Sequence, residues 1–198
     1  MAESKDTRDR IVTAARELFY ERGYAETSLA DILKKAEANS GSLYYFFKSK
    51  EELLLAVLDR YKEALWTELL GPTWKGVSDP LERIWALLNG YRQFLIMTEY
   101  TYGCPIGNLA LEVVNRYPAA RQKIYENFEG WRLAVRKCLE DAGARLPVDI
   151  DRDKLATFVL TVMEGGVMQA RSAHSIDPFD ASLFMLRDYV NRLIASAG

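Results

Sequence analysis

The chain has 198 residues, 49% of them hydrophobic and 27% charged, with a formal net charge of −2 at pH 7. This composition can fill one large or two small cores, and it excludes disordered and fibrous proteins. No run of about 18 apolar residues occurs and the N-terminus is charged, so we expect neither a membrane contact nor a signal peptide. Two cysteines fit a reducing compartment, so the expected location is cytoplasmic.

Nearly every segment has the periodicity of an α-helix, and none reads as a credible strand. The first carries apolar residues at i, i+3, i+4, i+7 and i+8 from Ile11 and stops at Gly23, a usual C-terminal cap. A second, short helix begins at Thr27-Ser28, and after a turn a third begins at Asn39. Two short helices after a stabilising one form a helix-turn-helix, whose second short helix can enter a DNA major groove.

The rest of the chain predicts a larger helical bundle. A long helix opens with a capping box at Ser49, and the Gly- and Pro-rich stretch 71–80 breaks the chain after it. Later helices follow prolines, which suit the first turn of a helix. We therefore expect an all-α fold of about nine helices. The expected domains are a helix-turn-helix DNA-binding domain at residues 1–50, with a connector helix from about 50 to 70, and a ligand-binding and dimerisation domain at residues 51–198.

The third helix predicts an outward face suited to DNA. If Leu43 points inward, steps of 100° per residue place Phe46 and Phe47 in the core beside it. The opposite and lateral positions are small in the first turn and phenolic in the second, which suits base edges and phosphates. The residues on these positions are Gly41, Ser42, Tyr44 and Tyr45.

Two lysines flank Ser49 at the start of the long helix. The helix dipole disfavours a cation there by about 0.3–1 kcal/mol, so Lys50 would gain from an external anion bound at the same place. A solvated lysine pair in a loop is the alternative; beside a helix-turn-helix and exposed tyrosines we favour phosphate contacts for Lys48 and Lys50. Residues 1–50 hold nine basic and eight acidic side chains, a net of +1, so recognition has to rely on geometry and dimerisation.

Residues 8–58 resemble the DNA-binding domain of the tetracycline-repressor (TetR) family of bacterial transcriptional regulators. The resemblance rests on a helix, a Gly-aromatic turn, a T-S cap, G-S-L-Y-Y and F-x-S-K-E in that order, roughly a quarter of the chain. The all-α remainder has the length expected of that family's effector domain. Two positions depart from the family pattern. Glu37 stands where glycine is usual, at a cost of about 1–2 kcal/mol if its φ is positive, and Phe46 replaces a histidine that commonly touches phosphate, so no contact is assigned to it.

The resemblance also implies a role for each DNA-facing residue. Thr27 and Ser28 would hold a phosphate at the start of the second helix. The residues expected to face bases are Ser40, Gly41, Ser42 and Tyr45. The residues expected to hold the DNA backbone are Tyr44, Lys48 and Lys50, and Asn39, the cap of the third helix, completes the DNA-binding set.

The last two helices are the expected dimer interface. Gly165 and Gly166 lie in mid-helix at a propensity cost of about 1 kcal/mol each, which close helix packing would explain. The family resemblance implies that these helices pair into a four-helix bundle between two subunits. An internal helix contact is the alternative for the glycine pair.

Aromatic residues concentrate between Trp66 and Trp131, and the helix faces that carry them could converge on an effector cavity. Asn108 and Glu112, at i and i+4, could supply polar contacts to such a cavity, although a surface pair is equally compatible. The residues expected to line the effector site are Trp66, Trp85, Leu88, Cys104, Asn108, Glu112, Phe128, Trp131 and Met163.

The primary hypothesis is a homodimeric repressor that binds a palindromic operator in double-stranded DNA and is released by a small apolar or amphipathic effector. The first alternative is a regulator that senses oxidants or electrophiles through Cys104. This cysteine directly precedes a helix that begins at Pro105, and the dipole of a helix lowers the pKa of a thiol at its N-terminus. A buried, inert thiol is the other interpretation of Cys104. An all-α small-molecule binding protein without a DNA role is the second alternative. One histidine and the absence of catalytic motifs predict no enzyme, and we expect neither cofactor nor metal.

Overall fold

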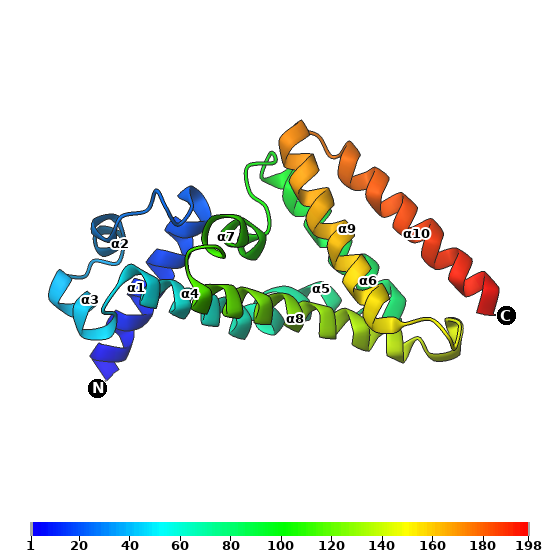
Figure 1. The fold of residues 1–198 in the computed structure, drawn as a ribbon, viewed down its shortest axis with the longest axis horizontal. Coiled ribbons are helices and arrows are strands. Elements are labelled where there is room, and N and C mark those ends of the chain that lie inside the picture. The colour runs from blue at the N-terminus through cyan, green and yellow to red at the C-terminus, as the bar shows by residue number, and fades with distance from the viewer. Residues whose placement is uncertain (1, 198) are drawn as a thin grey trace. The chain divides into compact units, whose positions relative to one another are not determined.

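The computed structural model describes residues 2–197, with side chains from Asp6 onward, and these residues contain helices and no strand. The elements, labelled in Figure 1, are α1 (Ala2–Arg22), α2 (Leu29–Lys35), α3 (Ser40–Phe46), α4 (Lys50–Ala64), a π-helical stretch (Leu65–Leu70), α5 (Gly71–Trp74), α6 (Pro80–Met97), α7 (Pro105–Val113), α8 (Pro118–Asp141), a 3-10 turn (Gly143–Arg145), α9 (Arg152–Ala173) and α10 (Asp177–Ala197). Because α4, the π-helical stretch and α5 follow one another without a gap, the expectation of an all-α fold of about nine helices is confirmed.

The chain forms two compact units, each described here by itself. The first unit contains residues 1–63 and 105–127, and the second contains residues 64–104 and 128–198. The helix-turn-helix therefore shares its unit with α7 and with the first part of α8. No helix of the described residues is long and apolar enough to cross a membrane.

Local caps explain where the short helices of the first unit begin. The Ser28 hydroxyl accepts the Asp31 N–H at 3.1 Å, and the Asp31 carboxylate accepts the Ser28 N–H, which completes a capping box at α2. Asn39 caps α3 by accepting the Ser42 N–H at 2.8 Å. In α3 Leu43 is fully buried, and Phe47 directly after the helix is 3% exposed, as predicted. The core position predicted for Phe46 is wrong, because this side chain is only half-buried at the end of the helix.

Buried polar bonds attach α8 to α4 within the first unit. The Asn127 amide, 3% exposed, donates to the backbone oxygen of Leu58 at 3.1 Å and to that of Lys123 at 2.9 Å. Lys62 of α4 pairs with Glu126 of α8 at 2.9 Å beside it. A buried amide with both donors bonded specifies one register between two helices, because any slip would leave these donors unsatisfied.

The break expected at residues 71–80 begins later than the composition indicated. Gly71 has helical dihedrals (φ −58°, ψ −53°), so the helical path that starts at Lys50 continues to Trp74. Gly71 is needed because a side-chain Cβ there would lie 2.8 Å from the backbone oxygen of Trp66. The π-helical stretch crowds this turn, so the glycine here permits a distorted helix instead of ending it.

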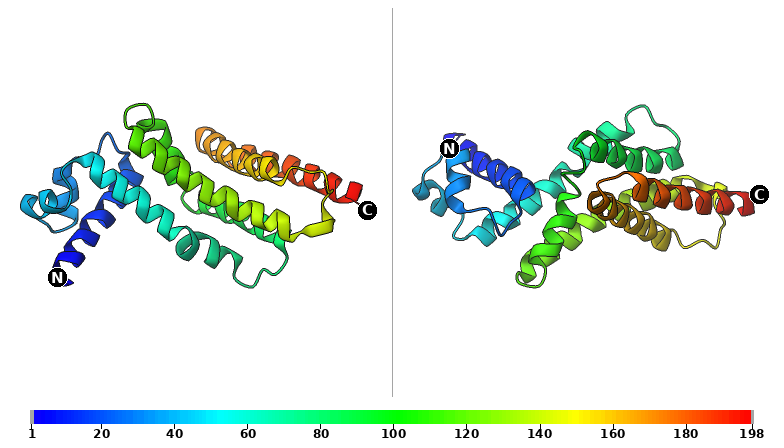
Figure 2. Two further views of the ribbon diagram at one scale, coloured as in Figure 1. Left: turned by 60° about the horizontal axis from the view of Figure 1, so that its bottom comes forward. Right: turned by 90° about the horizontal axis from the view of Figure 1, so that it is seen from above.

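The second unit is built around the antiparallel pair α9 and α10, which lie side by side in every view (Figures 1 and 2). Arg92 of α6 forms two hydrogen bonds with the Asp180 carboxylate of α10, at 2.7 and 2.8 Å. Planar two-point pairing of this kind fixes orientation as well as distance. It therefore sets how α10 lies against α6.

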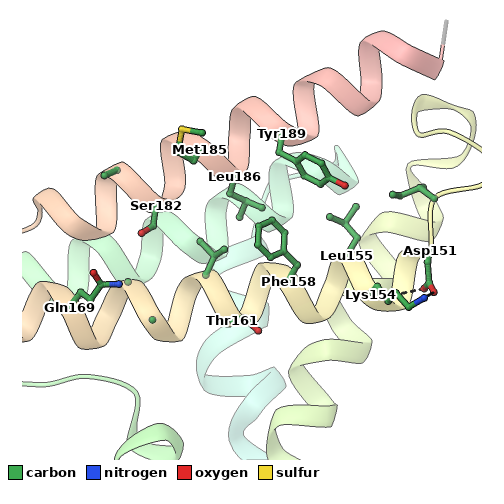
Figure 3. A pocket seen from close by; sticks show the side chains of 15 residues that line it. Asp151, Lys154, Leu155, Phe158, Thr161, Gln169, Ser182, Met185, Leu186 and Tyr189 are labelled. Carbon is green, nitrogen blue, oxygen red and sulfur yellow. Dashed lines mark hydrogen bonds and ion pairs between the residues drawn. The ribbon is translucent and has the colours of Figure 1, made fainter.

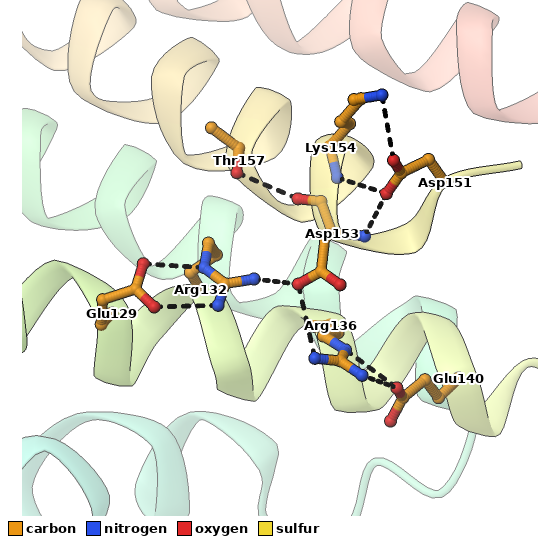
Figure 4. A network of polar contacts seen from close by, with 8 residues as sticks. All are labelled: Glu129, Arg132, Arg136, Glu140, Asp151, Asp153, Lys154 and Thr157. Carbon is orange, nitrogen blue, oxygen red and sulfur yellow. Dashed lines mark hydrogen bonds and ion pairs between the residues drawn. The ribbon is translucent and has the colours of Figure 1, made fainter.

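A network of ion pairs holds the N-terminus of α9 against α8 (Figure 4). Arg132 makes two 2.8 Å bonds to Glu129 on its own helix and a third bond to Asp153 of α9. Arg136 pairs with the same Asp153 carboxylate at 3.4 Å. The Arg132 hydrogen bond keeps the pKa of Glu129 below its usual value, so Glu129 is ionised at neutral pH.

Candidate nucleic-acid interface

The outward face of α3 is exposed while its inner face is buried. Tyr45 is 79% and Tyr44 59% exposed, whereas Phe47 is 3% exposed. Phe46 is half-buried and lies edge-on to the Tyr45 ring, with ring centroids 4.9 Å apart. The other residues assigned to this face are exposed or half-buried: Asn39, Ser40, Gly41 and Ser42. Two large phenols left in solvent beside a buried Leu43 form a surface suited to another molecule.

The start of α2 presents one of its two expected contacts. Ser28 is exposed, and its hydroxyl lies 2.6 Å from an Asp31 carboxylate oxygen. This hydroxyl and the Ser28 N–H hold the pKa of Asp31 below its usual value. An anion arriving here would therefore meet a carboxylate that is already bonded to the cap.

The structure corrects the role expected for the Thr27 side chain. Thr27 is only 1% exposed, and its hydroxyl donates to the backbone oxygens of Gly23 at 2.7 Å and Leu18 at 3.2 Å. A side chain so placed secures the turn between α1 and α2 and does not reach the surface. The Thr-Ser pattern marks the helix cap, and only the fold decides which of the two hydroxyls is turned inward.

Lys48 and Lys50 differ in environment. Lys48 is exposed, but the Lys50 ammonium donates to the backbone oxygen of Tyr24 at 2.5 Å and lies 4.3 Å from the centre of the Tyr24 ring. Burial lowers the pKa of Lys50, partly offset by Glu112 and Glu26. Lys50 thus points toward the α1–α2 turn, and a phosphate contact by it stays a prediction that requires the side chain to turn.

The first turn of α4 already has an internal anion. Ser49 accepts the Glu52 N–H at 3.1 Å, and the Glu52 carboxylate accepts the Lys48 N–H at 2.8 Å. The Glu52 carboxylate thus occupies part of the place at which an external anion was expected. A phosphate would have to join this arrangement at its edge, beside the exposed Lys48.

Comparison with known proteins identifies the family. Residues 11–57 match the family model described as "Bacterial regulatory proteins, tetR family". Residues 80–182 match the one described as "Transcriptional regulator LmrA/YxaF-like, C-terminal domain". The chain belongs to the TetR family of transcriptional regulators. The predicted resemblance and the helix-turn-helix regulator class are thereby confirmed.

Relatives of similar length share this organisation. The HTH-type transcriptional regulator LmrA of Bacillus subtilis is 29% identical over 174 residues, 87% of this chain and 90% of that protein. YxaF of the same organism, an HTH-type transcriptional regulator, is 30% identical over 169 residues, 85% of this chain and 86% of that protein. The crystal structure of a TetR transcriptional regulator from Chloroflexus aurantiacus is 29% identical, with a TM-score of 0.81 covering 96% of this chain and 97% of that one.

Some of the residues expected at the effector site of this TetR-family regulator converge in the second unit. The Trp131 ring of α8 lies 6.1 Å from Phe128 and 6.0 Å from Tyr91 of α6, measured between ring centroids. Tyr91 was not among the expected site residues, although its position three residues after the buried Leu88 places it on the same helix face. Leu88 and Met163 are fully buried, consistent with a core position for both.

The two other tryptophans that we expected at this site, Trp85 and Trp66, make their ring contacts elsewhere. Trp85 is half-buried, with the Arg187 guanidinium 5.2 Å from the centre of its ring. Trp66 is exposed and makes an edge contact with Trp74 at 5.7 Å. Neither contact joins Trp66 to Trp131, and the Trp66 side chain is 61% exposed.

Cys104 is buried against a carboxyl group that the sequence reasoning missed. Its thiol donates a hydrogen bond to Glu164 of α9, and burial raises the pKa of Glu164. One oxygen of Glu164 is buried without a hydrogen-bond partner. The signal for Glu164 was available, since a glutamate stands in the otherwise apolar run around Met163. Cys138, on α8, is an ordinary core thiol whose pKa is raised by burial to about 11.

The polar pair Asn108 and Glu112 lies on α7 and so belongs to the first unit. Asn108 is half-buried, whereas Glu112 is exposed and its carboxylate accepts the Ala25 N–H at 3.0 Å. The predicted effector contact of Glu112 is untested, but in this structure its carboxylate binds the α1–α2 turn.

The two glycines of α9 face different surroundings. A Cβ on Gly166 would lie 2.9 Å from the Phe179 ring of α10, so this glycine serves an internal contact. A Cβ on Gly165 would meet nothing within 4 Å. Both glycines line a mostly apolar groove of about 990 Å³ between α9 and α10, where Phe158 and Tyr189 meet edge to face with ring centroids 5.9 Å apart (Figure 3).

Proposed function

We propose that this regulator is a homodimeric repressor that binds a palindromic operator through α3 and releases it when a small apolar or amphipathic molecule binds the second unit. The observation that supports DNA binding is that α3 has one buried face and one face exposed to solvent. Leu43 and Phe47 are buried, while Tyr44 and Tyr45 are exposed to solvent, as is Lys48 shortly after them in the chain. Phenolic hydroxyls and a lysine suit phosphates, and the small first turn of α3 suits base edges.

The groove between α9 and α10 supports the dimer. Exposed apolar side chains line it, including Phe158, Met185 and Tyr189. Large apolar side chains gathered on one helix pair favour burial against a partner, and a second copy offers the same surface by two-fold symmetry. A two-fold dimer would carry two α3 helices, as recognition of a palindrome requires.

The ring cluster of Tyr91, Phe128 and Trp131 supports an aromatic effector site. Aromatic walls with few polar groups are usual for pockets that take small apolar ligands. A ligand that binds one arrangement of the helices better than the other would shift the operator-binding equilibrium by that difference in affinity.

The structure speaks against thiol sensing as the signal. Cys104 is 2% exposed, and its thiol is hydrogen-bonded to the Glu164 carboxyl group, which disfavours the reactive thiolate. Cys104→Ser should therefore leave operator binding and its release unchanged. Loss of release in this variant, with operator affinity retained, would favour the thiol sensor.

Selection of binding sites from a pool of random DNA duplexes tests the proposal directly. The wild-type protein should enrich one palindrome, and its affinity for that duplex should fall steeply as salt rises. Tyr45→Ala should weaken binding by about 10-fold or more, because it removes an aromatic anchor at the centre of the contact surface. The control is Tyr125→Ala, which removes an exposed tyrosine of α8. No enriched sequence, or equal losses in the two variants, would contradict the proposal and favour a binding protein without a DNA role.

A further inference from the structure

The turn between α1 and α2 is held by three side chains, one from the loop itself and two from the helices α4 and α7. Thr27, just after the turn, binds the Gly23 backbone oxygen at 2.7 Å. Lys50 of α4 binds the Tyr24 oxygen at 2.5 Å. Glu112 of α7 accepts the Ala25 N–H at 3.0 Å across 87 positions of sequence. These bonds satisfy successive backbone groups of the turn that leads directly into α2.

The contact of Glu112 with this turn is close on two sides. Gly23 has φ +86°, and a Cβ on it would lie 2.7 Å from the other carboxylate oxygen of Glu112. The carboxylate thus occupies the space that any other residue at position 23 would need. The same corner is packed by Tyr24 and Tyr117, whose ring centroids are 5.5 Å apart and whose hydroxyls are hydrogen-bonded.

Glu112 is therefore the point at which α7 is attached to the backbone that positions α2 and α3. We propose that Glu112 is a positioning residue for DNA recognition: through the Ala25 N–H it fixes the placement of α2 and α3 against α7 and passes displacements of α7 to them. The inference rests on the proposed DNA-binding function, and it departs from the expectation that Glu112 contacts an effector.

The first test compares Glu112→Ala with Glu112→Gln, whose amide oxygen can still accept the Ala25 N–H. Leu111→Ala is the control, because Leu111 is the neighbouring residue of α7 and is 79% exposed. In Glu112→Ala the Ala25 amide hydrogen should exchange about 10-fold faster by NMR, and affinity for the selected duplex should fall by about 3–10-fold, as expected for one lost charge-assisted hydrogen bond. Glu112→Gln should lie within about 2-fold of the wild type in both measurements.

The second test asks whether α7 acts through Glu112. Ala110→Gly loosens α7 by lowering its helix propensity. It should speed Ala25 exchange and weaken duplex binding when Glu112 is present, and it should add nothing to either when combined with Glu112→Ala. A merely stabilising role of Glu112 would instead give additive effects, which are measured by the double-mutant cycle.

The outcomes separate this inference from the proposed function. If Glu112→Ala exchanges the Ala25 amide hydrogen and binds the duplex as the wild type does, the inference is overturned and DNA binding is left intact. Additive effects of Glu112→Ala and Ala110→Gly in the double-mutant cycle would overturn it as well. Failure of the wild-type protein to enrich any duplex would overturn the proposed function, and the exchange measurements would still decide whether Glu112 holds the turn.

Discussion

Glu37 adopts a backbone conformation that glutamate rarely takes. Its φ is 48°, in the turn between α2 and α3, which is the geometry that the family's usual glycine suggested. Glu99, Tyr100 and His174 are the other non-glycine residues of the described chain with positive φ. A side chain in this region costs energy that the surrounding contacts must offset, so these positions are the local weak points of the backbone.

Glu37→Gly should raise the free energy of unfolding by about 0.5–1 kcal/mol, because the relief of left-handed strain exceeds the entropy cost of glycine. Urea unfolding of the two proteins measures the difference. Glu26→Gly is the control, an exposed glutamate without a positive φ, and it should give no gain. Equal effects of the two changes would mean that φ is not the cause.

Glu164 should make stability depend on pH. Burial raises its pKa in the folded protein, so its contribution to stability is complete below its ordinary pKa and is lost as pH rises through the folded pKa. Glu164→Gln, which does not titrate, should match the wild type near pH 4 and be more stable than it at about pH 8. Unfolding by urea across this range checks the prediction, with the exposed Glu63→Gln as control. A difference that is the same at every pH would contradict it.

Between elements, single side chains decide which helices touch. Arg132 ties α8 to the start of α9, and Arg92 ties α6 to α10, each through carboxylates at hydrogen-bonding distance. Gly166 allows α9 and α10 to approach, since the Phe179 ring occupies the place of its missing side chain. Gly165, its neighbour in sequence, has no such neighbour in space and lies on the groove.

The two glycines should therefore respond differently to alanine. Gly166→Ala should lower the free energy of unfolding by about 1–3 kcal/mol, because the new methyl group overlaps the Phe179 ring. Gly165→Ala should raise helix stability by up to about 1 kcal/mol. Urea unfolding separates the two effects, and sedimentation shows whether Gly165→Ala alters self-association. Similar destabilisation by both would mean that Gly165 also has a close neighbour.

For the whole molecule, charge alone does not predict DNA binding. The net charge is −2, and the basic side chains near α3 are few, so two copies acting together must supply the affinity that one lacks. The proposed dimer is thus a condition of the proposed function. The surface proposed for this dimer is the mostly apolar groove between α9 and α10.

Met185→Glu should convert the protein to a monomer and weaken operator binding by at least about 100-fold, because symmetry places a charge in the apolar interface from both sides. Sedimentation and duplex titration measure the two losses, and circular dichroism should show an unchanged helix content. Met97→Glu is the matched control, since Met97 is 76% exposed, compared with 62% for Met185, and does not line the groove. A Met185→Glu protein that remains dimeric would place the interface elsewhere.

The sequence by itself determined the features that depend on neighbours along the chain. Helix periodicity, the caps at Ser28 and Asn39, and the division of α3 into a buried and an exposed face all follow from contacts within a few residues. The motif that resembles the TetR family is likewise a pattern of residues close together in the sequence. Glu37 could even be assigned its positive φ, because backbone geometry in a short turn is a local property.

Only the tertiary structure decided where long side chains point and which helices meet. The Thr27 side chain points inward, the Lys50 ammonium binds a backbone oxygen of the α1–α2 turn, and the Glu112 carboxylate binds the Ala25 N–H. Gly166 packs against Phe179, whereas its neighbour Gly165 has no such contact. Each of these contacts joins segments distant in sequence, or selects one of several rotamers of a flexible side chain. Periodicity specifies the face of a helix, but the partner that covers this face is set by how all the helices pack together.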